Sequence, residues 1–380
     1  MRDGEITGID YATRKPVCLR WQAGRISEAS AAPKAPVDAW WIAPPLVDLQ
    51  VNGYAGVDFQ RDDLNAADLL KAVRGLRAAG CTRILLTLIT DEWPKLVARV
   101  RRYRELRAQS GELQNAIIGW HIEGPFLSAE PGFRGAHNPD VMCDPTPAHI
   151  EELRAVTGSD PVLITVASER TGSLAAIRQA VSAGFKVSLG HTNAPLDNLR
   201  EAVKAGASAF THLGNGCPKD LDRHDNIFLR VFDTPGLTVG LIVDRIHISP
   251  MFLRLAHRVL PEERIYYTTD AMSAAGAPPG RYTIGRLELE VGADQVVRLP
   301  GKPNFAGSAL RPIDGILRAA QMLNRPWHEL WKHFAEIPAK YIGLRNDLGI
   351  GQPANFCLLR VNQPEEKAEL KVYLDGAEVS

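Results

Sequence analysis

Four side chains that can bind a metal ion or transfer a proton stand near the ends of apolar, β-branched runs. Glu123 lies in "GWHIEGP", His191 in "SLGHTNA", His212 in "THLGNG" and Asp270 in "TTDAMSAAG". One carboxylate and two imidazoles can hold a divalent cation and leave coordination positions for water and substrate. A separate carboxylate, Asp270, can then accept a proton from that water. The residue types indicate a metal site with a proton acceptor beside it.

Each of these residues also has a simpler explanation when it is taken alone. A single histidine at the end of a strand is usually solvated, and a glutamate before Gly-Pro belongs to a turn. An aspartate before a run of small residues usually caps a helix. The chemical interpretation therefore depends on whether the fold brings all four residues to one edge.

In the middle of the chain, short apolar runs alternate with longer amphipathic segments, as in an α/β barrel. Most of the gaps between its apolar runs hold an amphipathic helix, and those at 64–80, 172–184 and 195–206 end on glycine. Strands alternating with helices predict a (β/α)8 TIM-like barrel, whose functional residues lie at the C-terminal ends of its strands. The eight predicted strands are 46–51, 84–89, 116–122, 162–167, 185–189, 207–211, 238–243 and 265–269.

Both ends of the chain contain short β-like runs that cannot bury a core by themselves, at 17–21, 354–361 and 369–374. We therefore predict a small β-sandwich domain formed from residues 1–44 and 346–380. Residues 45–345 form the barrel, which is the catalytic domain. After the eighth strand we expect a hairpin over 287–301 and two helices, at 311–324 and 326–343.

The composition argues against several classes of partner. The 44 basic and 44 acidic residues give a net charge of zero, which does not support binding to nucleic acid or to an anionic membrane. No apolar stretch has the length of a membrane span or a signal peptide. The five cysteines are scattered and show no C-x-x-C pairing, which is typical of reduced thiols. We expect a cytoplasmic protein.

The motifs taken in order resemble one enzyme family. "PPLVDLQVNGYAGVDF", "GWHIEGPFLS", "GAHNP", "SLGHTNA", "THLGNGCP", "TTDAMSAAG", "AGSAL" and "LGIGQPANFCLLRV" follow one another as in N-acetylglucosamine-6-phosphate deacetylases of the amidohydrolase superfamily. The resemblance runs from about residue 40 to about residue 360. It implies that Glu123, His191 and His212 bind the metal and that Asp270 is the general acid/base. It also implies that His137 stabilises the oxyanion.

The same resemblance implies how the substrate, a small amino sugar, is held. Arg223 and His247 would meet its phosphate, with a partner subunit supplying part of that contact, so we expect a homodimer. The residues implied to line the sugar are Ala136, His137, Asn215, Gly216, Phe305, Ala306 and Gly307.

Gln50 and Asn52 occupy the positions at which many amidohydrolases carry the H-x-H motif that binds a second metal. Neutral amides are poorer ligands than imidazole for a zinc-like ion. We therefore expect one divalent metal ion per chain, zinc, and place Gln50 and Asn52 among the substrate-binding residues.

The chain departs from the family pattern where substrate is recognised. Arg245 replaces a glycine in "VDRIH", and "HLGNG" has Gly214 and Gly216 where the family more often has a larger residue and an alanine. The segment 217–226 keeps Arg223 but follows it with His-Asp-Asn, and this arginine could instead form a surface ion pair. The possible partners are Asp220, Asp222 and Asp225.

The leading hypothesis is deacetylation of N-acetylglucosamine 6-phosphate to glucosamine 6-phosphate and acetate. One alternative keeps the chemistry and changes the substrate to a different N-acyl amino sugar, including an unphosphorylated one. The second alternative is a non-catalytic barrel that binds a sugar.

Overall fold

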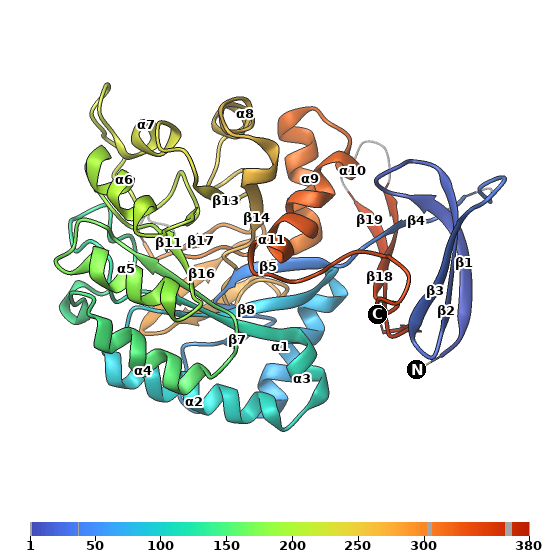
Figure 1. Cartoon of the computed structure of the whole chain (residues 1–380), viewed down its shortest axis with the longest axis horizontal. Coiled ribbons are helices and arrows are strands. Elements are labelled where there is room, and N and C mark those ends of the chain that lie inside the picture. The colour runs from blue at the N-terminus through green and yellow to red at the C-terminus, as the bar shows by residue number, and fades with distance from the viewer. Residues whose placement is uncertain (1, 37, 302–305, 362–366, 380) are drawn as a thin grey trace.

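The computed structural model consists of a barrel wrapped by helices and a smaller β-structure beside it (Figure 1). It describes residues 2–36, 38–301, 306–361 and 367–379. The smaller β-structure contains the first and the last strands of the chain, and the barrel lies between them in sequence.

Eight strands form the barrel, as the sequence predicts. They pair in chain order, each parallel to the next. Most of their residues are buried, because the interior and the ring of helices cover both faces of the sheet. The strands are β5 Leu46–Val51, β8 Cys81–Ile89, β9 Ile117–Glu123, β10 Val162–Val166, β11 Lys186–Leu189, β12 Ala209–Phe210, β13 Thr238–Ile242 and β14 Ile265–Thr268.

The barrel closes between β5 and β14. Val51 forms a parallel bridge with Ala271, just beyond the end of β14. Asp48 of β5 accepts hydrogen bonds from the Thr269 amide at 3.0 Å and the Thr269 hydroxyl at 2.6 Å, and also from the Thr268 hydroxyl. Asp48 is fully buried, and this burial raises its pKa to about 6. A buried carboxyl group thus joins the first and last strands.

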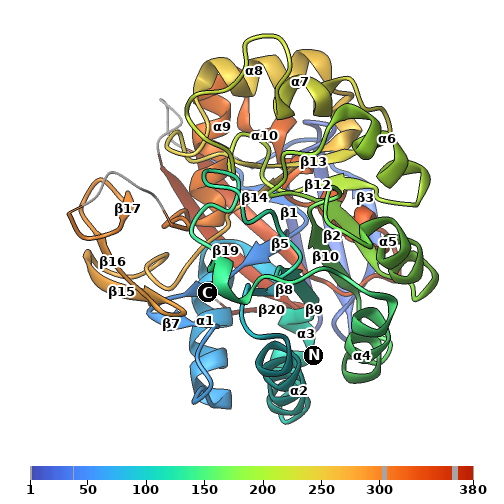
Figure 2. The ribbon, with the colours of Figure 1, turned by 90° about the vertical axis from the view of Figure 1, so that its left-hand side faces the viewer.

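Helices follow most of the strands and surround the barrel (Figure 2). The glycine signals hold for α1, α5 and α6, which are followed by Gly80, Gly184 and Gly206 with φ of 86°, 80° and 110°. Residues without a side chain adopt this left-handed conformation at little cost. The helices of the ring are α1 Ala66–Ala78, α2 Trp93–Ala108, α3 Gly111–Ala116, α4 Pro147–Thr157, α5 Ser173–Ser182, α6 Leu196–Lys204, α7 Ile227–Phe232, α8 Pro250–Val259 and α9 Pro312–Leu323.

The predicted helix over 326–343 is wrong as a single element. The structure breaks it into α10 Trp327–Leu330, a 3₁₀ turn at Trp331–His333 and α11 Glu336–Tyr341. Pro338 explains the break, because proline has no N–H to donate to the carbonyl of Phe334 four residues earlier. That carbonyl accepts from the Val47 amide of β5 at 2.8 Å instead. The interruption therefore attaches this segment to the barrel.

The smaller β-structure is one seven-stranded sheet in the order β20-β19-β18-β4-β1-β2-β3. The ring of Trp21 on β2 lies 5.4 Å from that of Phe356 on β18, although in a flat sheet three strand spacings would separate them by about 14 Å. The sheet therefore folds over on itself, which confirms the predicted sandwich. Its strands are β1 Gly4–Asp10, β2 Pro16–Gln22, β3 Arg25–Ala31, β4 Trp41–Ala43, β18 Phe356–Val361, β19 Ala368–Leu374 and β20 Ala377–Glu378.

A small sheet borders the mouth of the barrel. The predicted hairpin corresponds to β16 Leu287–Val291 and β17 Val297–Arg298, and β15 Gly280–Ile284 adds a third antiparallel strand. A shorter hairpin, β6 Gly53–Tyr54 with β7 Val57–Asp58, follows β5. Two further 3₁₀ turns are Pro139–Val141 and Glu262–Arg264. The domain boundaries at 44 and 346 remain a prediction.

Among the described residues, no helix combines the length and the apolar character that a membrane crossing requires.

The raised pKa of Asp48 predicts a pH-dependent cost of replacing it. In the folded protein Asp48 keeps its proton up to about pH 6, whereas in the unfolded chain it loses the proton near pH 4. Its contribution to stability is therefore complete below about pH 4 and is lost as the pH rises through about 6. Between about pH 5 and 7.5, the unfolding free energy of the wild type minus that of Asp48→Asn should fall by about 1 kcal/mol.

Urea titrations at several pH values measure this difference. The exposed Asp294→Asn variant is the control, because its aspartate has a lowered pKa and does not titrate in this range. A difference for Asp48→Asn that stays constant with pH would contradict the proposed titration of Asp48.

Candidate active site

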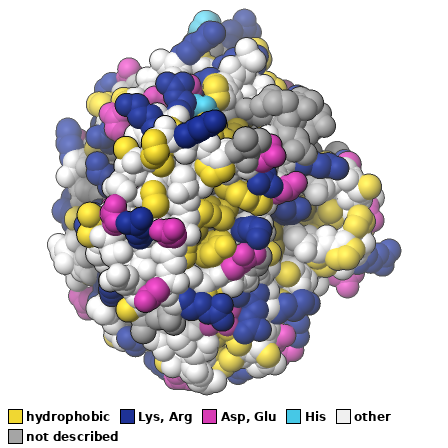
Figure 3. Space-filling model, turned by 90° about the vertical axis from the view of Figure 1, so that its right-hand side faces the viewer, with side chains coloured by type: hydrophobic (Ala, Val, Ile, Leu, Met, Phe, Trp, Pro, Cys, Tyr) yellow, Lys and Arg dark blue, Asp and Glu magenta, His cyan; other side chains and the backbone are white. Residues whose placement is uncertain are grey.

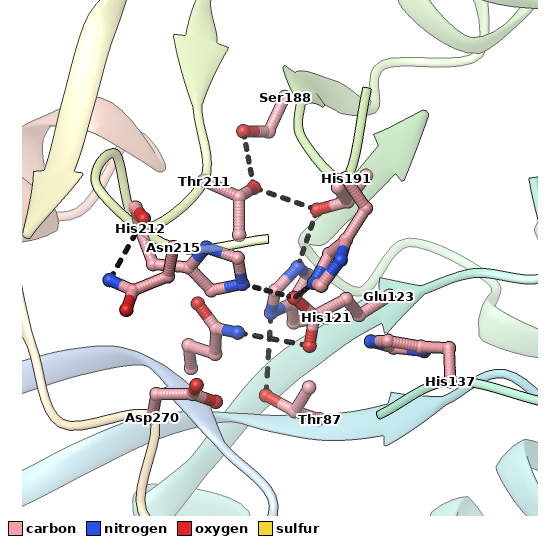
Figure 4. Close-up of polar contacts among 12 residues, drawn as sticks. Thr87, His121, Glu123, His137, Ser188, His191, Thr211, His212, Asn215 and Asp270 are labelled. Carbon is pink, nitrogen blue, oxygen red and sulfur yellow. Dashed lines mark hydrogen bonds and ion pairs between the residues drawn. The ribbon is translucent and has the colours of Figure 1, made fainter. Parts of the chain in front are cut away.

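Glu123, His191 and His212 meet at the C-terminal end of the barrel (Figure 4). Glu123 ends β9, and the two histidines follow β11 and β12. Their ligand atoms all lie within 4.8 Å of one another, and the three side chains are buried. The Glu123 Oε1 atom is 2.9 Å from His212 Nε2 and 3.5 Å from His191 Nε2.

The orientation of His191 suits a metal ligand. Its Nδ1 lies 2.7 Å from the carbonyl oxygen of Phe133, which can only accept, so this nitrogen carries the proton. Its Nε2 faces the Glu123 carboxylate, so it donates to that carboxylate when it carries a proton and offers a lone pair to a metal ion when it does not. Two electron-pair donors that face the same small volume fit a cation between them. The donor set of these three residues therefore fits a divalent metal ion.

The backbone turns sharply at three of the predicted residues. His191, His212 and Asp270 have φ of 48°, 32° and 51°. Such left-handed conformations cost a residue with a side chain about 1–3 kcal/mol and concentrate at functional sites. Here each residue lies just beyond the end of a barrel strand, so the turn directs the three side chains toward the same point.

Two glycines make room for the His191 ring. A Cβ atom on Gly135 would lie 2.9 Å from His191 Cε1, and one on Gly216 would lie 2.8 Å from His191 Nδ1. Gly216, predicted to line the sugar, therefore packs against a predicted metal ligand. Its contact with substrate remains a prediction.

The electrostatics separate the roles of the two carboxylates. Burial would raise the pKa of Glu123, but the hydrogen bonds from His191 and His212 outweigh it and hold this pKa well below its usual value. Burial and the charge of Glu123 raise the pKa of Asp270 to about 7. Asp270 can therefore exchange a proton near neutral pH, as a general acid/base must.

Gln50 and Asn52 support these carboxylates. Gln50 Nε2 donates to Glu123 Oε2 at 2.9 Å, and Asn52 Nδ2 donates to Asp270 Oδ1 at 2.7 Å. Both amides are buried at the end of β5. Their observed partners are side chains of the site, and their predicted contact with substrate remains a prediction.

His137 borders the site from the side of β8. Its ring lies edge-on to His191, with centroids 4.5 Å apart, and its Nδ1 is 2.8 Å from the Thr90 hydroxyl. Burial and the neighbouring His191 lower the pKa of His137 to about 3. A neutral imidazole can offer a hydrogen bond here without adding a second positive charge.

The remaining residues predicted to line the sugar lie around this centre. Asn215 Nδ2 donates to the His212 carbonyl at 3.2 Å. Ala306 and Gly307 precede Ser308, whose amide donates to the Asp270 carbonyl at 3.0 Å. Ala136 lies next to His137, and Phe305 falls outside the described residues.

The two predicted phosphate ligands lie on neighbouring loops. His247, between β13 and α8, has its Nδ1 2.6 Å from Asp244 Oδ2. Arg223, between β12 and α7, is exposed, and in the described part of the chain it forms none of the ion pairs considered as an alternative. Asp225 pairs with Arg230 at 2.6 Å instead. The Arg223 guanidinium is therefore accessible to a ligand.

Comparison with known proteins gives the family. No protein-family model matches the chain. A curated N-acetylglucosamine-6-phosphate deacetylase of Danio rerio is 38% identical over 260 residues, which is 66% of this chain and 63% of that protein. The enzyme of the same name from Rattus norvegicus is 32% identical over 332 residues, 84% of this chain and 79% of the relative. The chain belongs to the N-acetylglucosamine-6-phosphate deacetylase family.

Two further comparisons agree with this assignment to the deacetylase family. An Escherichia coli O157:H7 protein named N-acetylgalactosamine-6-phosphate deacetylase is 30% identical and aligns with 83% of this chain and 82% of its own length. The Mycobacterium smegmatis N-acetyl-D-glucosamine-6-phosphate deacetylase is similar in structure, with a TM-score of 0.88, 29% identity and full coverage of both chains. That structure is an aspartate-to-alanine variant in complex with N-acetyl-D-glucosamine 6-phosphate.

Some residues of this deacetylase-family site are missing from the sequence analysis. Thr90, which contacts His137, follows β8, and an inspection of every strand end would have found it. His121 lies two residues before Glu123, so strand alternation turns both side chains into the barrel. Its Nε2 is 2.8 Å from Thr165 Oγ1 (Figure 4), and burial lowers its pKa to about 4.

The polar layer around His121 continues below the predicted metal ligands. Thr165 Oγ1 is 2.9 Å from Thr211 Oγ1, which is 2.6 Å from Ser188 Oγ. These hydroxyls come from three adjacent strands, β10, β11 and the end of β12. These hydroxyl groups form a hydrogen-bonded layer inside the barrel, beneath Glu123.

The support of Glu123 by Gln50 predicts an effect on metal affinity. In Gln50→Leu, the carboxylate loses the hydrogen bond that orients it, and divalent-metal affinity should fall about 10- to 100-fold. Asn52→Leu is the matched control, because Asn52 donates to Asp270. Competition with a chromogenic zinc chelator gives both dissociation constants. Equal losses in the two variants would mean that Gln50 has no particular role at the metal.

Proposed function

We propose that this protein hydrolyses the acetamide of N-acetylglucosamine 6-phosphate to glucosamine 6-phosphate and acetate, with one zinc ion per chain. The observation that carries the proposal is the convergence of Glu123, His191, His212 and Asp270 at the mouth of the barrel. Membership of the deacetylase family supports the choice of substrate.

The chemistry follows from the groups around this point. Glu123, His191 and His212 would hold a divalent ion, which when bound would supply a Lewis acid for the amide carbonyl and for a water molecule. Asp270 accepts the proton of that water and later delivers it to the departing amine nitrogen. Asn52 fixes the carboxylate of Asp270 for both transfers. His137 donates a hydrogen bond to the oxyanion.

One zinc ion is supported by the donor set. Two imidazole nitrogens and one carboxylate oxygen are typical of a catalytic zinc site that leaves a position open for water. At the positions of a second metal site, the Gln50 and Asn52 side-chain nitrogens donate to carboxylates. An amide could ligate a metal only through its oxygen, and this neutral oxygen is a poorer ligand for zinc than the imidazole of the H-x-H motif.

A homodimer is supported by an apolar surface on α7 and α8. Met251, Leu255 and Val259 follow one another at every fourth position of α8 and are 75%, 44% and 46% exposed. Leu229 of the adjacent α7 is 45% exposed. The loops that carry Arg223 and His247 lead into these two helices, so a partner bound here would lie near the proposed phosphate site. We place the protein in the cytoplasm, in agreement with its five free cysteines.

Acetate release by the zinc-loaded protein tests the proposal directly. The substrates are N-acetylglucosamine 6-phosphate, its 4-epimer N-acetylgalactosamine 6-phosphate, and unphosphorylated N-acetylglucosamine. Preference for the first supports the proposal, and preference for either of the others identifies a different amino sugar. Bound zinc without turnover of any of them would favour the sugar-binding barrel.

The role of Asp270 predicts a loss of turnover without a loss of metal. Asp270→Asn should lower kcat by about 10²- to 10⁴-fold, because the site loses its general acid/base. Bound zinc, measured by elemental analysis, should remain at one ion per chain. Asp294→Asn, in the exposed hairpin, is the control. If Asp270→Asn retains most of the activity, another group accepts the proton.

The role of Arg223 predicts a substrate-specific change in KM. Removal of a charged hydrogen bond to phosphate in Arg223→Ala should raise KM for the phosphorylated sugar roughly tenfold or more. The KM for unphosphorylated N-acetylglucosamine should not change. Lys219→Ala, an exposed cation on the same loop, is the matched control. An unchanged KM for the phosphorylated sugar would remove Arg223 from the phosphate site.

The apolar surface predicts that a charge on α8 prevents association. Met251→Asp should convert the dimer into a monomer, as measured by light scattering during size-exclusion chromatography, because a buried unpaired carboxylate is costly. Ile350→Asp is the control, because Ile350 is also strongly exposed, at 67%, but lies outside α7 and α8. A dimer that survives Met251→Asp must use another surface.

A further inference from the structure

A cavity next to His137 has no role in the mechanism above. Its volume is about 240 Å³, several times that of a water molecule in the liquid, about 30 Å³. It lies between the ends of β8 and β9 and the β15–β16 hairpin. Its lining residues include Ile89, Thr90, His137, Val141, Ile284 and Leu287.

The roof of the cavity is held in place by Asp58. The Oδ2 atom of Asp58 accepts from the Thr283 hydroxyl and from the Gly285 amide, both at 2.9 Å. Its Oδ1 accepts from the Gln60 amide, also at 2.9 Å. These bonds tie the turn of the β15–β16 hairpin to the segment after β5. The cavity is therefore formed by the fold itself.

The buried polar groups of the cavity already have partners in the protein. The Arg99 guanidinium contacts Asp91 at 3.0 Å and Asp62 at 2.8 Å. The Gln60 side chain donates to the Thr87 carbonyl and accepts from the Ile89 amide, both at 3.0 Å. A polar group of a ligand that entered the cavity would lose its hydration without forming hydrogen bonds to Arg99 or Gln60, because both side chains are already paired.

The apolar atoms of the lining are not fully covered. Ile89, Val141 and Leu287 are partly buried, and Arg286, the other charged residue at the cavity, is exposed to solvent. A ligand in the cavity would cover part of these three side chains. The lining therefore favours a short apolar chain.

His137 connects this cavity with the proposed reaction. The ring of His137 forms part of the cavity wall, and its edge lies against His191. Asp270, which protonates the departing amine nitrogen in the proposed mechanism, lies on the opposite side of Glu123 from His137 (Figure 4). A carbonyl oxygen held by His137 therefore places the acyl carbon and its substituent on the side of the cavity.

We propose that this cavity binds the acyl chain of the substrate, so that the enzyme hydrolyses straight acyl groups longer than acetyl, up to butanoyl. The proposal rests on the amide hydrolysis proposed above. Hydrolysis breaks the bond between the acyl carbon and the nitrogen. Water supplies a hydroxyl to the acyl carbon and a proton to the amine, and a short fatty acid leaves in place of acetate.

Turnover of N-acetyl-, N-propanoyl- and N-butanoylglucosamine 6-phosphate by the zinc-loaded protein tests this proposal. A pocket closed around a methyl group rejects each added methylene by about tenfold or more. We expect kcat/KM for the butanoyl substrate to be at least about a tenth of that for the acetyl substrate. A lower value overturns the proposal.

Variants of the hairpin assign the effect to this cavity. Leu287→Trp fills the space and should lower the ratio of butanoyl to acetyl kcat/KM by at least about tenfold. Leu287→Ala enlarges the space and should not lower this ratio. Glu288→Trp is the matched control, because its exposed side chain follows Leu287 on the same strand and alternates to the other face. If Leu287→Trp does not fold, Ile89→Phe narrows the cavity from β8.

Two results separate this proposal from the deacetylase proposal. Hydrolysis of the acetyl substrate alone overturns the acyl cavity and leaves the deacetylase intact. Failure of all three substrates overturns both. A butanoyl activity that neither Leu287→Trp nor Ile89→Phe reduces shows that the longer chain binds elsewhere, and this also overturns the proposal.

Discussion

The negative charge of Glu123 is the constraint on which the site depends. A carboxylate removed from water costs several kcal/mol unless charges or hydrogen bonds compensate it. Here the compensation comes from Gln50, His191 and His212, which belong to three other strands or strand ends. These groups reach one carboxylate only if β5, β9, β11 and β12 keep their register in a closed barrel. The requirement of one buried group therefore fixes the relative positions of strands far apart in sequence.

The same closure brings the second carboxylate into place. Asp48 joins β5 to β14, and the residues that follow these two strands, Asn52 and Asp270, then lie within hydrogen-bonding distance. The amides of Gln50, in β5, and Asn52, just after it, thus support different carboxylates, with Gln50 at the predicted metal site and Asn52 at the predicted general acid/base. Under the proposal above, these two positions support two oriented carboxylates and leave one metal ion in the site.

Much of this arrangement could be predicted from the sequence. Period and β-branched composition identify the eight strands, and once strands are known, the residues at their ends identify Glu123, His191, His212 and Asp270. Thr90 was within reach of the same reasoning. Pro338 was visible as a helix breaker, but the contact of Phe334 with Val47 depends on tertiary structure. The roof that Asp58 holds over the cavity likewise joins segments that no local pattern relates. The contacts with substrate remain predictions, because they involve a molecule that the chain does not contain.

The pairing of β4 has a consequence for how the chain is made. This short strand pairs with β1 from the beginning of the sequence and with β18 from near its end. During synthesis, the first strands emerge from the ribosome long before the residues that cover them. Trp21 has no Phe356 to pack against until the whole barrel has been translated. The barrel can therefore fold while the N-terminal strands still expose apolar surface, and the ribosome-bound chain is the state most exposed to aggregation or to capture by chaperones.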